Sequence, residues 1–146
     1  MASRHRARTL ALQALYGLEV KSGADVESEL ARFLDHFHPD ATLRPFFLEL
    51  VRGTLAHRTE IDEAVGRCSE HWKIERMPAV DRNLLRLGVY EILHQNEIPP
   101  EVTISEAVDL AKRFGGAETP GFVNGILDRV AREAGRLPAK VAVGGS

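Results

Sequence analysis

The sequence predicts an all-α domain of about seven helices. Apolar residues recur three and four positions apart over most of the chain, and residues that start or stop helices separate these stretches. No run alternates convincingly between apolar and polar residues as a half-buried strand does. With 146 residues, 44% of them hydrophobic and 27% charged, the chain is long enough to bury one core.

Four helices are expected in the first half of the chain. The first, at about 3–20, carries an apolar stripe that includes Ala7, Ala11 and Leu15. The second should cover about 25–37, and Pro39 follows it. The third and fourth are expected to begin at Pro45 and near Thr59, and the fourth to end near Trp72.

The fifth predicted helix runs from Ala79 to about Gln95, after a charged loop at 73–78. Its apolar residues point in nearly every direction around the helix axis. A helix that is apolar on most sides is buried on most sides, so this helix should lie at the centre of the bundle.

Two further helices are predicted near the C-terminus. Thr103 and Glu106 have the spacing of a capping box, which predicts the start of the sixth helix, and Phe114-Gly-Gly predicts its end. Thr119 is the expected N-cap of the seventh helix, with Pro120 at its first position. The small, Gly-rich residues 137–146 should form a frayed tail.

Composition argues against several classes of protein. No apolar run approaches the roughly 20 residues that span a bilayer, and the N-terminus lacks the apolar segment of a secretory signal. Cys68 is the only cysteine and cannot form an internal disulfide, which is typical of a cytoplasmic protein.

Charge is distributed unevenly along the chain. Of 19 basic and 21 acidic residues, three arginines and no acid fall in residues 1–18, which leaves 16 basic and 21 acidic residues and a net charge of −5 beyond. This pattern predicts one anionic and one basic partner. A cationic tail that only aids solubility is the alternative.

The N-terminal arginines Arg4, Arg6 and Arg8 precede an aromatic residue, Tyr16, on the polar face of the first helix. His5, Thr9 and Gln13 share that face. Cations that bind phosphate beside a ring that stacks on an unpaired base are typical of RNA binding. The alternative is that the Tyr16 ring packs under another helix.

The sequence gives little support for catalysis, and we expect no enzyme activity, cofactor or metal. Cys68 and His71 are three residues apart, but Cys68 falls on an apolar stripe and reads as a small core residue. The six histidines form no H-x-x-x-H pattern and no cysteine cluster accompanies them, so no zinc site is predicted.

Several segments, taken in order, resemble the NusB family of transcription antitermination factors across roughly residues 4–134. They are Arg4-His-Arg-Ala-Arg8 with Gln13-Ala-Leu-Tyr16, residues 81–91, residues 98–112 and, most specific, Phe122-Val-Asn-Gly-Ile-Leu-Asp128. Ser105 stands where the family usually has Asn.

The resemblance implies one domain at 1–136, made of helical subdomains at about 3–72 and 78–136. It also implies an RNA-binding factor that loads with NusE, a ribosomal protein, onto boxA-type single-stranded RNA. Such a factor joins the RNA polymerase antitermination complex, mainly on ribosomal RNA operons. Family members occur as monomers and as dimers, so a homodimer is left open.

Together, the residues and the resemblance assign two surfaces. The RNA-binding residues would be Arg4, His5, Arg6, Arg8, Tyr16, Phe122 and Asn124. Glu75 and Asp81 would bind NusE. For Phe122 the alternative is a place at the edge of the core, and for Asp81 it is stabilisation by the dipole of its own helix. Gly125, in mid-helix, suggests close approach of a neighbouring helix or a ligand.

Two other functions remain as alternatives. The chain could be an RNA-binding domain related to those of ribosomal RNA cytosine methyltransferases, although no Rossmann-type domain or Gly-rich cofactor loop accompanies it. It could also be a helical adaptor that binds no RNA, in which case neutralising the N-terminal arm would change nothing.

Overall fold

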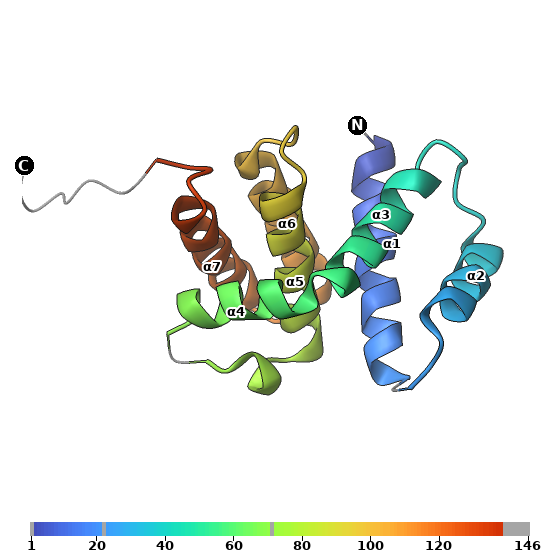
Figure 1. Ribbon diagram of the computed structural model, residues 1–146, viewed down its shortest axis with the longest axis horizontal. Coiled ribbons are helices and arrows are strands. Elements are labelled where there is room, and N and C mark those ends of the chain that lie inside the picture. The colour runs from blue at the N-terminus through green and yellow to red at the C-terminus, as the bar shows by residue number, and fades with distance from the viewer. Residues whose placement is uncertain (1, 22, 71, 139–146) are drawn as a thin grey trace, which may run out of the picture.

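The computed structural model describes residues 2–21, 23–70 and 72–138, apart from the side chains of residues 2 and 3, and these residues confirm the all-α class. They form seven α-helices and one short 3₁₀ helix, η1, and include no strand (Figure 1). The elements are α1 Ala2–Val20, α2 Val26–Phe37, α3 Arg44–Ala56, α4 Arg58–Cys68, η1 Ile74–Arg76, α5 Ala79–His94, α6 Pro100–Phe114 and α7 Thr119–Glu133.

The start of α2 shows how local chemistry sets a helix boundary. The carboxylate of Asp25 accepts hydrogen bonds from the backbone N–H and the hydroxyl of Ser28, at 2.9 and 2.7 Å. This satisfies one of the donors that a helix start leaves open. At the other end, His38 adopts a left-handed conformation, φ 44°, and its N–H donates to the carbonyl of Leu34.

The end of α4 and the start of α6 differ from the predicted boundaries. Helix α4 ends at Cys68, four residues earlier than expected, and α6 begins at Pro100. Pro100 starts α6 because a proline needs no hydrogen-bond partner in the first turn and already has a helical φ. Thr103 and Glu106 therefore lie inside the helix and form no capping box.

Thr119 is the first residue of α7 and not its N-cap, which is Glu118. The Thr119 hydroxyl instead donates to Asp81 Oδ1 at 3.1 Å and accepts from the Gly116 N–H at 3.0 Å. This one side chain therefore connects the beginning of α7 to the beginning of α5.

Helix α5 lies in the middle of the molecule, as predicted, and packs against α1, α3, α4, α6 and α7 (Figure 1). Its residues from Asn83 to Ile92 are all buried. Helix α1 runs antiparallel to it, because Arg8 pairs with Glu91 and Glu19 pairs with Arg82. Burying a side chain such as Leu85 contributes about 1.5–3 kcal/mol, so α5 anchors the core.

The described core is continuous across residues 73–78, where Ile74 and Met77 belong to it. The two predicted subdomains would therefore share one core, and their division stays a prediction. The predicted tail starts too early, because Leu137 packs against the core and its N–H donates to the Ala131 carbonyl at 3.2 Å. Residues 139–146 of that tail lie outside the described residues.

Candidate functional site

The N-terminal half of α1 presents two of its three arginines to solvent. Arg4 and Arg6 are exposed. The guanidinium of Arg4 lies 5.2 Å from the centre of the Phe46 ring, so a residue of α3 orients it through a cation–π contact. Both arginines can therefore offer positive charge to an anionic ligand.

Arg8, unlike Arg4 and Arg6, is buried, and the structure does not support the prediction that it contacts RNA phosphate. Its side chain is 3% exposed and donates from Nε and Nη2 to the two carboxylate oxygens of Glu91, each at 2.8 Å. The first helix turns this residue inward onto α5, and a phosphate could reach the guanidinium only by displacing Glu91.

The ion pair extends into a small buried network. Thr103 donates its hydroxyl to Glu91 at 3.1 Å, and Glu106 accepts from Arg8 at 3.4 Å. The other oxygen of Glu106 lies 2.7 Å from Nδ1 of His5. The network joins α1, α5 and α6, and it holds His5, half-buried, against α6 beside the exposed arginines.

Tyr16 lies on the surface of α1, with 43% of the residue exposed, as the prediction requires. Not all of the residues predicted to lie on the same polar face of α1 are exposed, however. Thr9 is 2% exposed, and its hydroxyl donates to the His5 carbonyl. Helix α1 packs against α2, α3 and α5, which covers more of its circumference than its apolar stripe predicts.

Tyr16 and Phe122 lie toward the same end of α5. The ion pairs Arg8–Glu91 and Glu19–Arg82 join α1 to α5. Tyr16 lies three residues before Glu19 on α1, and is therefore nearer to the start of α5 than to its end. Phe122 is in the first turn of α7, which Thr119 connects to Asp81 at the start of α5. Helix packing thus places two aromatic residues that are 106 positions apart in the sequence toward the same end of the central helix.

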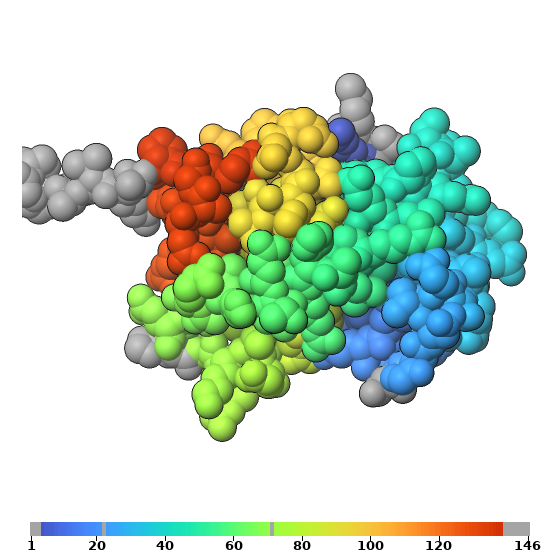
Figure 2. All heavy atoms as spheres, viewed as in Figure 1, coloured from blue at the N-terminus to red at the C-terminus, as the bar shows by residue number. Residues whose placement is uncertain are grey.

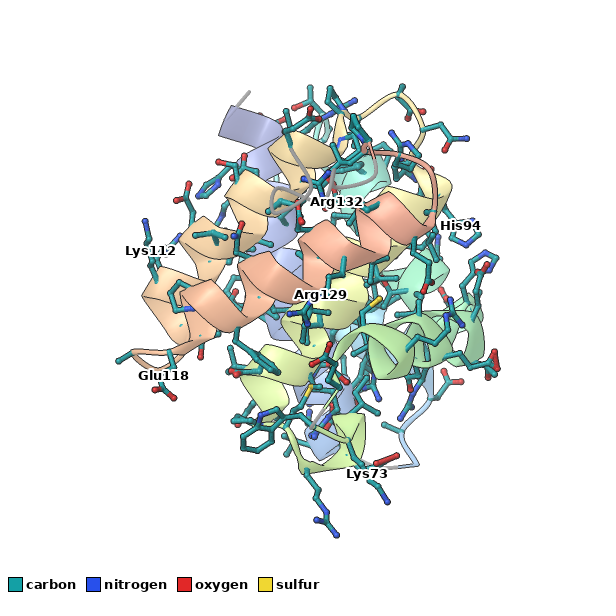
Figure 3. The ribbon with its side chains drawn as sticks, turned by 90° about the vertical axis from the view of Figure 1, so that its left-hand side faces the viewer. Lys73, His94, Lys112, Glu118, Arg129 and Arg132 are labelled. Carbon is teal, nitrogen blue, oxygen red and sulfur yellow. The ribbon has the colours of Figure 1, made fainter. Side chains whose placement is uncertain are left out.

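Phe122 borders a hollow of about 560 Å³ at the turn between α6 and α7. Its ring meets Trp72 edge to face, with the centroids 6.4 Å apart, and Trp72 is 55% exposed. Glu118 projects into solvent at the same turn, as Figure 3 shows. The sequence did not single out Trp72 as a site residue, because the expected extension of α4 hid its place in a loop.

Two features expected near the start of α7, a free N–H at Phe122 and close packing at Gly125, are not found. The N–H of Phe122 already donates to the Glu118 carbonyl at 3.1 Å, so it is not free for phosphate. Asn124 is exposed. A Cβ on Gly125 would meet nothing within 4 Å, so the expected close approach of a neighbouring helix is absent.

The two acidic residues expected to bind a partner differ in accessibility. Glu75 is exposed on η1, which protrudes at the lower edge of the molecule in Figure 2. Asp81 is 7% exposed and accepts the Thr119 hydroxyl. The prediction of Asp81 as a surface charge is therefore not supported, since the helix that carries it packs against α7.

A second hollow, of about 900 Å³, lies between α4 and η1 beside Glu75. Its walls carry four carboxylates and one ammonium group, that of Lys73, which Figure 3 shows at the lower edge of the molecule. The acids are Asp62, Glu63, Glu70 and Glu75. The acidic surface is thus wider than the sequence indicated.

Cys68 has the environment of a core residue. It is 6% exposed, and burial together with the nearby Glu133 carboxylate raises the pKa of its thiol. A raised pKa keeps the group as an unreactive thiol. His71, three residues after Cys68 in the sequence, lies outside the described residues.

These features define a helical binding protein with two surfaces: exposed arginines and aromatic side chains on one, carboxylates on the other. In residues 2–21, 23–70 and 72–138, no helix is both long enough and apolar enough to cross a membrane. The NusB family model matches residues 5–132, and the chain belongs to the NusB family.

The similarity extends over nearly whole chains. The transcription antitermination protein NusB of Desulforapulum autotrophicum is 47% identical over 132 residues, which are 89% of this chain and 92% of the relative. The corresponding protein of Myxococcus xanthus is 44% identical over 136 residues, 90% of this chain and 96% of that one.

Solved structures give the same result. NusB of T. maritima superposes with a TM-score of 0.83 at 40% identity and covers 89% of this chain and 91% of its own. A structure of the antitermination factors NusB and NusE in complex with dsRNA has a TM-score of 0.81 at 27% identity, and covers 91% and 98%.

Proposed function

We propose that this chain is an RNA-binding transcription antitermination factor that binds boxA-type single-stranded RNA together with NusE, mainly during transcription of ribosomal RNA operons. One observation carries the RNA half of the proposal. An aromatic ring, Tyr16, stands exposed on the same helix as two exposed arginines, in a family whose matched relatives are antitermination proteins.

The RNA would follow α1 and cross to the start of α7. Arg4 and Arg6 would contact phosphates, since charge without base specificity provides most of the affinity in such complexes. Tyr16 would stack on one base, and Phe122, with Trp72 beside it, on another. Asn124 would offer its amide from the exposed side of α7. In this scheme Arg8, through Glu91, and His5, through Glu106, hold α1 in place against α5 and α6. Arg8 itself contacts no phosphate.

Stacking on Tyr16 and Phe122 favours an unpaired strand. A base inside a duplex already has both faces covered, whereas bases of single-stranded RNA can turn onto aromatic side chains. The related NusB–NusE structure contains dsRNA. The choice between the two forms of RNA is therefore part of the test.

NusE would contact the acidic surface around Glu75. The hollow between α4 and η1 supplies carboxylates that suit a basic protein, and Glu75 is exposed at its rim. Asp81 would act from within, by holding the start of α7 through Thr119. This role would place the protein in the cytoplasm with the transcription machinery. A homodimer, as some family members form, would be a second state in competition with these contacts.

Fluorescence titration of a labelled boxA RNA tests the proposal, with single-stranded and duplex forms compared at several salt concentrations, with and without NusE. We expect tighter binding to the single strand, and a further gain when NusE is present. Replacing Arg4 and Arg6 by Ala should lower the log–log salt slope by about 0.7 for each lost contact with a single-strand phosphate. An unchanged slope would remove the arm from the RNA site. Absence of RNA binding by the unchanged chain, with NusE binding intact, would favour a helical adaptor that binds no RNA.

A further inference from the structure

Two histidines and one glutamate from different parts of the chain meet on the surface. His57 joins α3 to α4, Glu60 is in the first turn of α4, and His94 is the last residue of α5. Figure 3 shows His94 projecting toward solvent at the edge of the molecule. One ligand atom from each of the three side chains lies within 4.8 Å of the other two.

We propose that His57, Glu60 and His94 bind a divalent transition metal ion, with zinc as the best fit. Oxygen Oε1 of Glu60 lies 2.7 Å from Nε2 of His94 and 3.6 Å from Nδ1 of His57. Zinc binds imidazole nitrogen and carboxylate oxygen at about 2.0–2.2 Å, so ligand atoms this close are within reach of one shared ion once the side chains reorient. Two imidazoles among three ligands select zinc, copper or nickel over magnesium and calcium.

Ring geometry shows which ligand must move. The His57 and His94 rings are stacked with centroids 3.9 Å apart and an angle of 23° between them, so their nitrogen lone pairs run side by side and do not converge. Both rings are also stacked on Tyr90, His94 at 5.5 Å and His57 at 6.1 Å between centroids, so the contact with His94 is the closer one. The His57 side chain is 44% exposed and has room to turn. His94 and Glu60 thus form a preorganised pair, and His57 closes the site.

The electrostatic setting favours a cation. Helices α3 and α5 both end here, and the C-terminal end of a helix carries partial negative charge, part of which Arg136 already offsets by donating to the Ile92 carbonyl at 2.6 Å. The start of α4 has the opposite sign, but the carboxylate of Glu60 in its first turn offsets it. Arg58, the nearest cation in sequence, is directed to Asp62, with Nε and Oδ2 3.6 Å apart.

The bound ion would connect the α3–α4 junction to the end of α5 and leave one coordination position for water. Helix α5 has 16 residues, so at about 1.5 Å per residue this site is roughly 20 Å from the start of α5, where Asp81 and the Phe122 hollow lie. Metal binding and base stacking at Phe122 can therefore be measured separately.

Titration of the untagged chain with Zn²⁺ in a calorimeter, with Co²⁺ absorption as a second readout, tests the proposal. We expect one ion per chain and a rise in melting temperature when the ion is added. His94→Ala, His57→Ala and Glu60→Gln should each weaken binding by about 10- to 100-fold or more, since even loss of an outer-shell partner has that effect. Thermal melting without metal establishes that each variant folds. If His94→Ala fails to fold, His57→Ala still tests the site, because His57 is exposed.

The matched control is the double variant His36→Ala, His38→Ala, which removes two histidines from the exposed end of α2. It should bind Zn²⁺ as the unchanged chain does. Absence of binding to the unchanged chain would overturn the proposal. So would binding that survives His57→Ala and Glu60→Gln, or binding that only the control variant abolishes.

Discussion

Arg8 and Glu91 form the most deeply buried ion pair in the described part of the chain, at 3% and 2% side-chain exposure. Each charge offsets the desolvation free energy of the other, because a single charge buried in the interior loses its hydration without compensation. The pair therefore matters for folding, whereas Arg4 and Arg6, a few residues away, matter for what the surface binds.

Replacing Arg8 by Ala should lower the free energy of unfolding by about 3–5 kcal/mol, because Glu91 is left charged and buried. Urea denaturation followed by circular dichroism measures the change. The matched control is Arg6→Ala on the same helix, which should cost less than about 0.5 kcal/mol of stability and should weaken RNA binding. Equal effects of the two substitutions on stability would contradict the assigned role of Arg8.

Replacing Tyr16 by Ala should cost about 1–3 kcal/mol of RNA affinity if its ring stacks on a base. Folding stability should change little, because the ring is largely exposed. Val20→Ala serves as the control, since Val20 is also exposed on α1 and should not affect RNA affinity. A sharp drop in melting temperature with RNA affinity preserved would show that the Tyr16 ring serves packing.

At the scale of helices, hydrogen bonds between polar side chains fix how α1 sits on α5. Near the end of α1, Glu19 accepts hydrogen bonds from Arg82 and from Asn83, the latter at 2.8 Å. Burial disfavours the charged form of Glu19, but the hydrogen bonds from Arg82 and Asn83 outweigh it and lower the pKa of this carboxyl below its usual value. Folding is thus coupled to the ionisation of Glu19.

Because the pKa of Glu19 is lower in the folded chain than in the unfolded chain, its stabilisation is complete above the unfolded pKa and is lost as pH falls through the folded one. Glu19→Gln should therefore be less stable than the unchanged chain at pH 7. The difference should shrink as the pH is lowered below about 4.3, the ordinary value for Glu. Urea denaturation at several pH values measures it, and a difference that does not depend on pH would contradict this account.

Helical periodicity predicted the existence of all seven helices and the central place of α5, since burial follows directly from where apolar residues point. Boundaries were less secure because one pattern can have two causes. Thr103 and Glu106 have capping-box spacing, yet their actual partners, Glu91, Arg8 and His5, come from other helices. The site depends even more on tertiary packing: Arg8 is seven residues from Leu15 and so shares the inward face of α1, but the sequence does not show the Glu91 that its buried charge pairs with.

At the scale of the whole molecule, basic and acidic groups lie on surfaces that can act separately. Glu75 and Glu63 border the hollow between α4 and η1, and both are exposed. Asp81 is less suited to a charge-reversal test than its sequence position suggests, because a buried lysine there would face Thr119 and disturb the start of α7.

Reversing both charges, Glu63→Lys with Glu75→Lys, should slow association with NusE more than it speeds dissociation, because exposed charges act mainly on encounter. Binding of RNA to the free chain should be kept or slightly strengthened. Surface plasmon resonance with each partner measures both. A control, Glu101→Lys, makes the same kind of change on the exposed side of α6. Normal association of the double variant would move the NusE site to another face.

The hydrogen bond from Thr119 to Asp81 has a thermodynamic consequence for the two surfaces. It links the first turn of α7, which carries Phe122, to the first turn of α5, which follows directly after η1 and Glu75. A ligand that moves one of these turns would strain this hydrogen bond to the other, which predicts weak coupling between the two surfaces. Such coupling is reciprocal: whatever factor one ligand adds to the affinity for the second, the second adds to the affinity for the first.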